Sequence, residues 1–445
     1  MADGSPSFET RTAEWLGVRE AMDRVLADGR AGPVEERPLV HARGLALARS
    51  LRARATLPPF DNSAMDGYAV RGADVEGATE SAPRSLRVLG ETRPGEAPGP
   101  PVGPGEAVRV MTGGAIPPGA DSVIRVEHTD AEAGAAGTVE VRTDDDRGRH
   151  IRPAGQDMRA GEELLGAGTV LTPGAVAVAA ALGHATVPVV RPPRVSILST
   201  GDELRTVEGF DDVVAGRGIP DTNGPMLGAA VEACGAEAVS LGVARDRREG
   251  IRDRLRRALE TDLLLTTGGA SMGTGDLLKR VMEEEGLEVD FWRVRIRPGS
   301  PFSLARLPRP GGPPLPVLGL PGNPASAFVT FQVFARPLLL QMAGHARIHR
   351  RTVEARAGET ISSTPRLTHF HRVTLSRDPS GGRRPVAALA GHPSSGLVRS
   401  LGRAHGLGIV PEGMTAVEPG ESLEVVLLDD APGAVPVPAT GAPAG

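Results

Sequence analysis

Short apolar runs alternate with amphipathic helical patterns through the middle of the chain. The runs VSILST (195–200), AVSLGVA (238–244) and LLLTT (263–267) end at turn residues, and helical spacing of apolar positions follows each of them. A further apolar run leads into a long helical pattern over residues 324–342. Strands that alternate with helices in this way predict a doubly wound, mainly parallel α/β domain, which we bound at residues 194–345.

Short strand-like runs separated by Gly and Pro dominate two other parts of the chain. Residues 60–143 predict a β-rich domain, and the mixed patterns of residues 1–59 and 144–193 on either side make it an insertion into one elongated N-terminal domain. Residues 346–428 predict a small C-terminal β-barrel. Residues 429–445 are of low complexity, and we expect a disordered tail. The fold class is therefore multidomain, α/β plus β.

Two helical patterns lie near the N-terminus. Residues 12–29 carry apolar positions close to a 3.6 spacing and end at Gly29, and residues 39–53 follow with a similar pattern. Pro58 and Pro59 then break the run. We therefore expect two helices before the β-rich insertion.

The apolar run at 263–267 ends in a glycine-rich loop. Gly268, Gly269 and Gly273 let backbone N–H groups approach a ligand closely, and Asp276 can cap the helix that follows. The loop lacks the GK[ST] ending of a Walker P-loop and the GxGxxG spacing of a dinucleotide site. It predicts an anion cradle of another kind, although a connecting turn without a ligand has the same local pattern.

The same loop contains a literal GxSxG around Ser271. This motif would make Ser271 the nucleophile of a serine hydrolase, on the turn between a strand and a helix. In serine hydrolases of this kind, the nucleophile stands on a sharp strand-to-helix turn and the helix starts directly after the serine. Gly273 and Gly275 are poor helix formers and move the expected helix start to Asp276, which weighs against the hydrolase.

Acidic residues follow several strands of the predicted sheet. Glu203, Asp246 and Asp276 all come after apolar runs, and ligands of open α/β sheets bind beyond the carboxyl ends of the strands. Each acid alone could equally be a helix cap or a surface turn. Together they would repel an anion unless a hard cation such as Mg²⁺ lies between them, so they predict a metal-assisted phosphate site.

Composition excludes several classes of partner. The net charge of -5 gives no general attraction to nucleic acid or to an anionic membrane, and no apolar stretch reaches the length of a membrane span. Cys234 is the only cysteine, which excludes an intramolecular disulfide, and the N-terminus lacks a signal-peptide pattern. We expect a cytoplasmic protein. Two histidines, His369 and His371, share one strand face but are weak evidence for zinc without a third partner.

Nine short motifs occur in order over residues 12–428. They are SAMDGYAV (63–70), MTGGAIPPGAD (111–121), AGQDMRAGE (154–162), STGDEL (199–204), DTNGPML (221–227), TTGGASMGTGD (266–276), RPGSP (297–301), GLPGNPASA (319–327) and HFHR (369–372). Together they resemble the molybdopterin molybdenumtransferase family, MoeA, which includes the gephyrin E-domain.

The resemblance implies a four-domain, L-shaped homodimer whose central domain is similar to the molybdopterin adenylyltransferase fold. Members of the family take adenylylated molybdopterin and molybdate and release AMP and molybdenum cofactor, with Mg²⁺ or another divalent cation. Their site lies between the α/β and C-terminal domains and faces the β-rich insertion of the other subunit. The implied partners are the molybdopterin adenylyltransferase and proteins that deliver the cofactor to molybdoenzymes.

The resemblance also implies roles for residues of this sequence. The implied catalytic residues are Asp66, Glu203, Asp246 and Asp276, of which the last three also hold the metal. The implied substrate-binding and cofactor-binding residues are Thr112, Gly268, Gly269, Ser271, Gly273, Arg297, Ser300, Pro301, Ser326, Arg372 and Ser395.

One position departs from the family pattern in a way that affects charge. The usual KPGKP is RPGSP here, so Arg297 keeps the first cation and Ser300 lacks the second. Coulomb attraction to molybdate is then weaker, unless a nearby arginine such as Arg295 or Arg306 substitutes. Ser300 leaves open a second reading, a pterin-binding or scaffolding paralog without catalytic activity.

Overall fold

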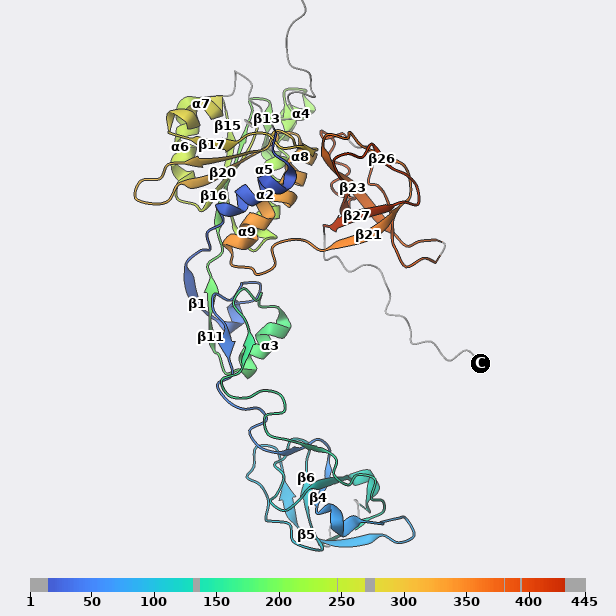
Figure 1. The fold of residues 1–445 in the computed structure, drawn as a ribbon. Helices are drawn as coiled ribbons and strands as arrows, with labels where there is room; N and C mark the ends of the chain where they lie inside the picture. The colour runs from blue at the N-terminus through green and yellow to red at the C-terminus, as the bar shows by residue number, and fades with distance from the viewer. Residues whose placement is uncertain are drawn as a thin grey trace, which may run out of the picture.

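The computed structural model describes residues 15–130, 137–245, 247–268, 277–379, 381–392 and 394–428. The molecule is elongated: the central sheet and the C-terminal barrel lie side by side at one end, and the β-rich sheet lies at the other (Figure 1). The predicted tail at 429–445 is outside the described residues. No helix in the described ranges is both long and apolar enough to cross a membrane.

The central sheet has six strands. In spatial order they are β15 (Glu237–Ala244), β12 (Arg194–Thr200), β16 (Leu263–Thr267), β20 (Leu315–Leu320), β19 (Ser303–Leu307) and β17 (Glu288–Phe291). The first four are mutually parallel and the last two run antiparallel to their neighbours. Because β12 pairs with both β15 and β16, the strand order reverses beside it, and the carboxyl ends of β12 and β16 form the switch point where ligands bind in such folds.

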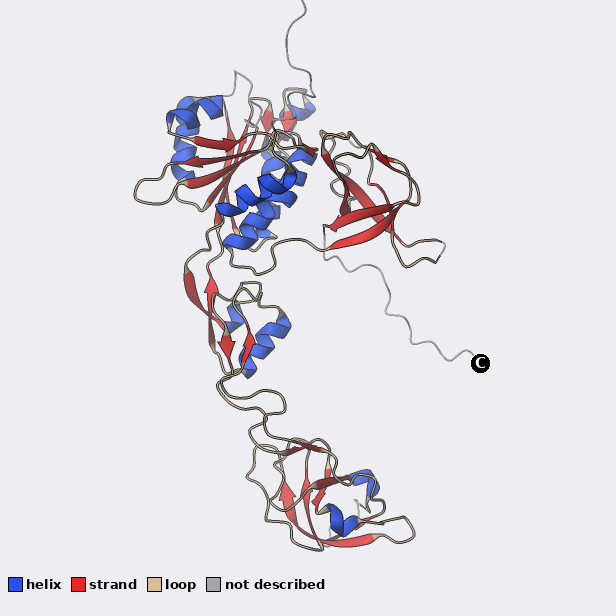
Figure 2. Ribbon diagram, viewed as in Figure 1, coloured by secondary structure: helices blue, strands red, loops and turns tan. Residues whose placement is uncertain are grey.

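Helices cover both faces of this sheet (Figure 2). One face carries α2 (Val18–Ala27), α5 (Asn223–Glu232), α8 (Pro324–Thr330) and α9 (Arg336–Met342). The other carries α6 (Arg248–Ala258) and α7 (Leu277–Glu284). Side chains alternate between the two layers: Leu263 and Leu265 pack into the first core and Leu264 into the second. The predicted doubly wound, mainly parallel domain is confirmed.

The predicted long helix over 324–342 contains a π-helical turn. Phe331–Ala335 joins α8 to α9 in this conformation. The first predicted N-terminal helix is present as α2, which packs against α9 and places Ala21 and Val25 in the core of the α/β sheet.

The second predicted N-terminal helix, over 39–53, is wrong. A short 3-10 turn at Leu39–His41 is followed by β2 (Leu51–Arg52), which pairs with β10 (Glu163–Leu165). Gly44 has a φ of +85°, which ends helical geometry. The apolar side chains that suggested a helical stripe, such as Leu47, are instead buried beneath α3 (Pro173–Ala181).

The C-terminal strands close into the predicted small β-barrel. Strands β23 (Thr368–Ser376), β24 (Val386–Leu389), β21 (Thr352–Ala357), β27 (Ser422–Leu427) and β25 (Gly406–Val410) follow one another, and β25 also pairs with β23. A two-residue strand, β18 (Ile296–Arg297), adds to β23 in parallel. This pairing joins the α/β domain directly to the barrel.

The β-rich sheet has five strands. In spatial order they are β7 (Ser122–Arg125), β4 (Gly67–Val70), β6 (Glu106–Val110), β5 (Arg84–Thr92) and β8 (Thr138–Val141). The chain enters and leaves this region through β3 (Asn62–Ser63) and β9 (Ile151–Arg152), which pair with each other. The sheet is therefore an insertion, connected to the stem formed by β1 (Val34–Pro38) and β11 (Thr186–Val190).

Candidate active site

A cavity of about 780 Å³ lies between the α/β domain and the barrel. Its walls are the turn after β18, the turn between β20 and α8, strand β23 and the segment before Ser395. Six residues that the sequence predicted as binding residues line it together: Arg297, Ser300, Pro301, Ser326, Arg372 and Ser395. Two domains thus build one site.

Arg297 is placed by the pairing of β18 with β23, which sets it opposite His369. Its side chain is exposed and, within the described residues, makes no hydrogen bond or ion pair. The five N–H donors of its guanidinium are therefore available to an anion in the cavity.

Arg372 is the second cation of the cavity and is only 5% exposed. Its Nε donates to Ser400 Oγ at 2.7 Å and its Nη2 to the Ser394 carbonyl at 3.2 Å. In the part of the chain that the structure describes, no carboxylate pairs with it, and burial lowers its pKa. A buried guanidinium with only neutral partners favours the binding of an anion beside it.

His369 and His371 lie between these cations. Their rings stack with centroids 5.3 Å apart, and burial together with the nearby positive groups lowers the pKa of each to about 4. Both rings are therefore neutral at pH 7. The Thr364 N–H donates to His369 Nε2 at 3.1 Å, whereas His371 Nε2 is buried and has no partner in the described ranges.

Within the described residues, His369 and His371 have no third side chain with which to hold zinc. Among the described residues, no three His, Cys, Asp or Glu side chains are grouped to hold a metal ion.

Gly268 links the cavity to the switch point of the sheet. It ends β16 with a φ of +82°, and a Cβ there would lie 2.6 Å from Thr200 Oγ1, so only glycine fits. Gly322 lies against Gly268, and the next residue, Asn323, donates from Nδ2 to Ser395 Oγ at 3.1 Å. The rim of the sheet and the wall of the cavity are therefore continuous.

Of the three acids predicted above for this rim, Glu203 is the one that the structure describes. It is exposed just beyond β12, and a Cβ at Gly201 would meet its Oε1 at 2.6 Å. The other predicted acids, Asp246 and Asp276, lie outside the described residues. So do Gly269, Ser271 and Gly273, which means that the predicted anion cradle and the hydrolase motif are untested.

Ser300 offers the cavity little charge or donor capacity. Its Oγ donates to the Ile296 carbonyl at 2.6 Å. Neither arginine that could replace a missing cation does so: Arg295 pairs with Glu412 at 3.1 Å and Arg306 with Asp28 at 3.0 Å, and neither lines this cavity.

Three family models match the chain in order. Residues 16–183 match the MoeA N-terminal region (domain I and II), residues 196–341 a probable molybdopterin binding domain, and residues 354–428 the MoeA C-terminal region (domain IV). The molybdopterin molybdenumtransferase 2 of Mycobacterium tuberculosis is 36% identical over 396 residues, which cover 87% of this chain and 93% of that protein. This chain belongs to the MoeA family.

Other MoeA relatives match over similar lengths. The molybdopterin molybdenumtransferase of Bacillus subtilis is 32% identical over 423 residues and 95% of each chain is covered. The crystal structure of the molybdopterin biosynthesis MoeA protein from Pyrococcus horikoshii aligns with a TM-score of 0.78 and 29% identity, and covers 93% of this chain and 100% of that one.

Two residues predicted for the site lie elsewhere in this MoeA chain. Asp66 Oδ1 accepts hydrogen bonds from Thr112, from the backbone N at 2.6 Å and from Oγ1 at 2.8 Å. These bonds lower the pKa of Asp66. Asp66 directly precedes β4 and Thr112 follows β6, and these strands lie at the end of the molecule far from β23 of the cavity (Figure 1). A single chain does not bring them to the site.

The sequence missed other polar residues that line the MoeA cavity, including Asn323, Ser363 and Thr364. Asn323 follows β20, so the rule that sites form beyond strand ends could have found it. Ser363 and Thr364 stand in the loop before β23, where no local pattern distinguishes them from ordinary turn residues.

Proposed function

We propose that this protein is a molybdopterin molybdenumtransferase, which inserts molybdate into adenylylated molybdopterin and releases AMP to form molybdenum cofactor. The observation that carries this proposal is the pair Arg297 and Arg372, two cations without a carboxylate partner among the described residues, facing one cavity. The printed names of the M. tuberculosis and B. subtilis relatives support the same activity.

The cavity offers distinct groups for the parts of the substrates. Arg297 and Arg372 hold molybdate and the pterin phosphate by charge-assisted hydrogen bonds. Ser326 and Ser395 line the same wall and can orient these oxyanions. Because two domains form the walls, closing of the barrel toward the sheet can exclude water from the reacting groups.

Mg²⁺ fits the rim at Glu203. The carboxylate of Glu203 is exposed beside the carboxyl end of β12 and makes no hydrogen bond within the described residues. Mg²⁺ needs few protein ligands, because it keeps waters and binds substrate phosphates. Glu203, together with Asp246 and Asp276, would hold the ion, and a bound ion would supply positive charge next to the phosphoanhydride.

A homodimer would complete the site. Asp66 directly precedes β4 and Thr112 follows β6, and these strands lie at the other end of the molecule from β23 of the cavity (Figure 1). Only a second subunit could therefore bring these two residues to the cavity. We place the protein in the cytoplasm, where the molybdopterin adenylyltransferase and cofactor-delivery proteins are its partners. A single buried cysteine, Cys234, agrees with a reducing compartment.

A pterin-binding paralog without turnover is the second candidate. The observation in its favour is Ser300, whose hydroxyl is bonded to the Ile296 carbonyl and adds no cation to the cavity. The serine hydrolase rests on Ser271 alone. Labelling of Ser271 by a fluorophosphonate, and its loss in Ser271→Ala, would be required to support it.

Active cofactor formation tests the proposal. The purified protein, adenylylated molybdopterin, molybdate and Mg²⁺ are mixed with a molybdoenzyme that lacks its cofactor, and the activity gained by that enzyme is measured. We expect activation by the wild type and roughly a hundredfold less by Arg372→Gln, since an oxyanion loses its buried cation. Arg377→Gln, an exposed arginine of the same barrel, should behave as wild type. Tight pterin binding without activation would favour the paralog.

A further inference from the structure

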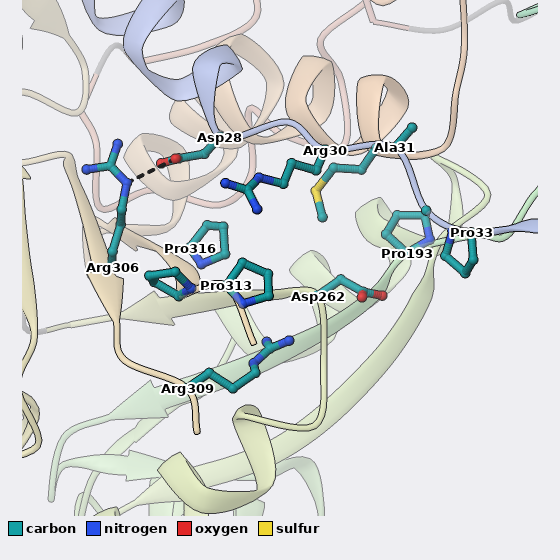
Figure 3. Close-up of a pocket in the computed structure, with 13 residues that line it drawn as sticks. Asp28, Arg30, Ala31, Pro33, Pro193, Asp262, Arg306, Arg309, Pro313 and Pro316 are labelled. Atoms are coloured by element: carbon teal, nitrogen blue, oxygen red, sulfur yellow. Dashed lines mark hydrogen bonds and ion pairs between the residues drawn. The ribbon is translucent and has the colours of Figure 1, made fainter. Parts of the chain in front are cut away.

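A second cavity, of about 360 Å³, lies at the amino ends of the parallel strands of the central sheet, and Figure 3 shows its lining. Pro193 and Asp262, which line it, stand directly before β12 and β16, so it opens at the amino ends of the parallel strands. Asp28 and residues 30–33 also line it, in the segment that leads from α2 to the stem strand β1. The chain crosses between the α/β domain and the stem at this point, which we call the hinge cavity.

The hinge cavity has an excess of positive charge. Both of its carboxylates are already paired: Asp28 accepts from Arg306 at 3.0 Å, and Asp262 accepts from Arg191 at 3.0 Å. Arg30 makes no side-chain hydrogen bond or ion pair within the described residues, and Arg309 donates only to the Thr261 carbonyl there. Two guanidinium groups are therefore left without a counterion.

Rigid apolar surfaces separate these two arginines. Arg30 and Arg309 reach in from opposite walls, with Pro313 and Pro316 drawn between them (Figure 3). Other apolar side chains complete the lining, namely Pro33, Pro193, Pro314 and Met342. Proline rings hold their shape on binding, so they suit a flat apolar body and cost little conformational entropy.

Two buried polar atoms of the hinge cavity lack partners. Asp28 Oδ2 and Arg309 Nε are both inaccessible to solvent and have no hydrogen bond in the described part of the chain. Such atoms are uncommon in folded proteins, and each calls for a partner. Because neither atom is open to solvent, the two atoms show that the cavity wall is polar but are not themselves contacts for a ligand.

We propose that the hinge cavity binds a small organic anion with a flat apolar body and one carboxylate or phosphate head, held by Arg30 and Arg309. Its volume lies within the range of small-molecule sites, about 300 to 1,000 Å³. A ligand there contacts the sheet, the linker of residues 28–33, and Pro193 of the linker 191–193. Binding therefore stiffens the connection between the α/β domain and the stem.

Calorimetric titration of the full-length protein tests the site. The probes are phenyl phosphate and benzoate, and inorganic phosphate serves as an anion that lacks the aromatic ring. We expect saturable one-to-one binding of one aromatic anion, about tenfold weaker binding of inorganic phosphate, and about tenfold weaker aromatic binding in Arg30→Gln. Whichever aromatic anion binds more tightly identifies the head as phosphate or carboxylate.

Arg297→Gln is the matched control, because Arg297 lines the other arginine-bearing cavity. Binding should be unchanged in this variant. Binding lost in Arg297→Gln but kept in Arg30→Gln would move the anion to the candidate active site and overturn the proposal. The absence of saturable binding by either aromatic anion would also overturn it.

Amide hydrogen exchange locates the effect independently of affinity. The Gly32 N–H donates to the Met342 carbonyl of α9, and the Arg191 N–H donates to the Pro33 carbonyl and joins the two linkers, each at 2.9 Å. Bound probe should slow exchange of both amides in the wild type and not in Arg30→Gln. Saturable binding that leaves their exchange unchanged would contradict a ligand in the hinge cavity.

Discussion

The hydroxyl of Ser300 is bonded to the backbone, and position 300 lines the cavity that holds Arg297 and Arg372. A longer cationic side chain at this position can extend into the cavity. The structure thus explains, at the scale of one residue, why a change of charge there should alter anion affinity more than it alters the fold.

Ser300→Lys should lower the molybdate concentration for half-maximal AMP release. An added ammonium group several ångströms from the anion contributes about 1 kcal/mol in a partly solvated site, which is roughly a fivefold to tenfold change. Steady-state AMP release over a molybdate titration measures it. A higher molybdate requirement in Ser300→Lys would contradict the charge argument.

His369 and His371 should make the barrel sensitive to mild acid. Their pKa values of about 4 in the folded barrel lie below the ordinary value for histidine. Between about pH 6.5 and 4, these two histidines are therefore protonated in the unfolded chain but remain neutral in the folded barrel. The free energy of unfolding therefore falls as the pH falls through this window. In the variant His369→Gln/His371→Gln it should fall by about 1 to 3 kcal/mol less, as measured by urea unfolding at pH 7 and pH 4.5. Equal losses in both proteins would refute this.

Elements differ in how far the sequence predicts them. The strand at 263–267 is buried on both faces of the sheet. Its leucines therefore follow one another with no polar residue between them, and this apolar run alone predicts the strand. The helix expected at 39–53 fails because Gly44 and long-range pairing with residues 163–171 override a local apolar spacing.

The candidate site was predictable to a similar extent. Arg297 ends β18 and Ser326 follows β20, so the rule that sites form beyond strand ends could have found both. The two-residue strand β18 itself depends on pairing with β23, some seventy residues away, which no local pattern encodes. The roles assigned to Arg372 and Ser395 came from the family resemblance. Their meeting in one cavity is a finding of the structure.

At the scale of elements, the buried side chain of Asp146 stabilises the β-rich sheet. Its side chain is fully buried, and Arg125 and His150 bond to it at 3.0 to 3.1 Å. Burial opposes its charge, but the bonds from the Arg125 side chain and backbone and from His150 outweigh this and lower its pKa to about 2. Asp146 therefore fixes the loop that packs beside β7 and the Asp66 turn.

Asp146→Asn should destabilise the β-rich sheet by about 2 to 3 kcal/mol at pH 7, since it leaves Arg125 without its buried partner. The contribution is present above about pH 4, the ordinary range of an aspartate, and is lost as the pH falls through about 2. Thermal unfolding at pH 7 and pH 2.5 measures both. Asp145→Asn, at an exposed neighbouring residue, is the control. An equal loss of stability in Asp145→Asn would show that Asp146 has no special role in stabilising the sheet.

At the scale of the whole molecule, the elongated shape of the chain keeps the predicted site residues far apart. Strands β4 and β6, beside Asp66 and Thr112, lie at one end, and β23, which pairs with the strand that holds Arg297, lies at the other (Figure 1). An antiparallel pair of subunits related by a two-fold axis can bring each β-rich sheet to the partner's cavity, because every contact in such a dimer occurs twice.

A mixed dimer tests this arrangement. Asp66→Ala and Arg297→Ala should each be inactive alone. A heterodimer of the two, purified through different tags, should recover about half of the wild-type rate, because one of its two sites is then free of both substitutions. A heterodimer as inactive as its parents would show that the site is built within one chain.

The most direct test of the account is AMP release from adenylylated molybdopterin by the wild-type protein with Mg²⁺, measured with and without molybdate. We predict release that requires molybdate and is lost in Arg372→Gln, because we propose that the buried guanidinium of Arg372, which lines the cavity, holds the oxyanion. Release that is independent of molybdate, or unaffected by Arg372→Gln, would contradict the claim that this cavity is the site of molybdate insertion.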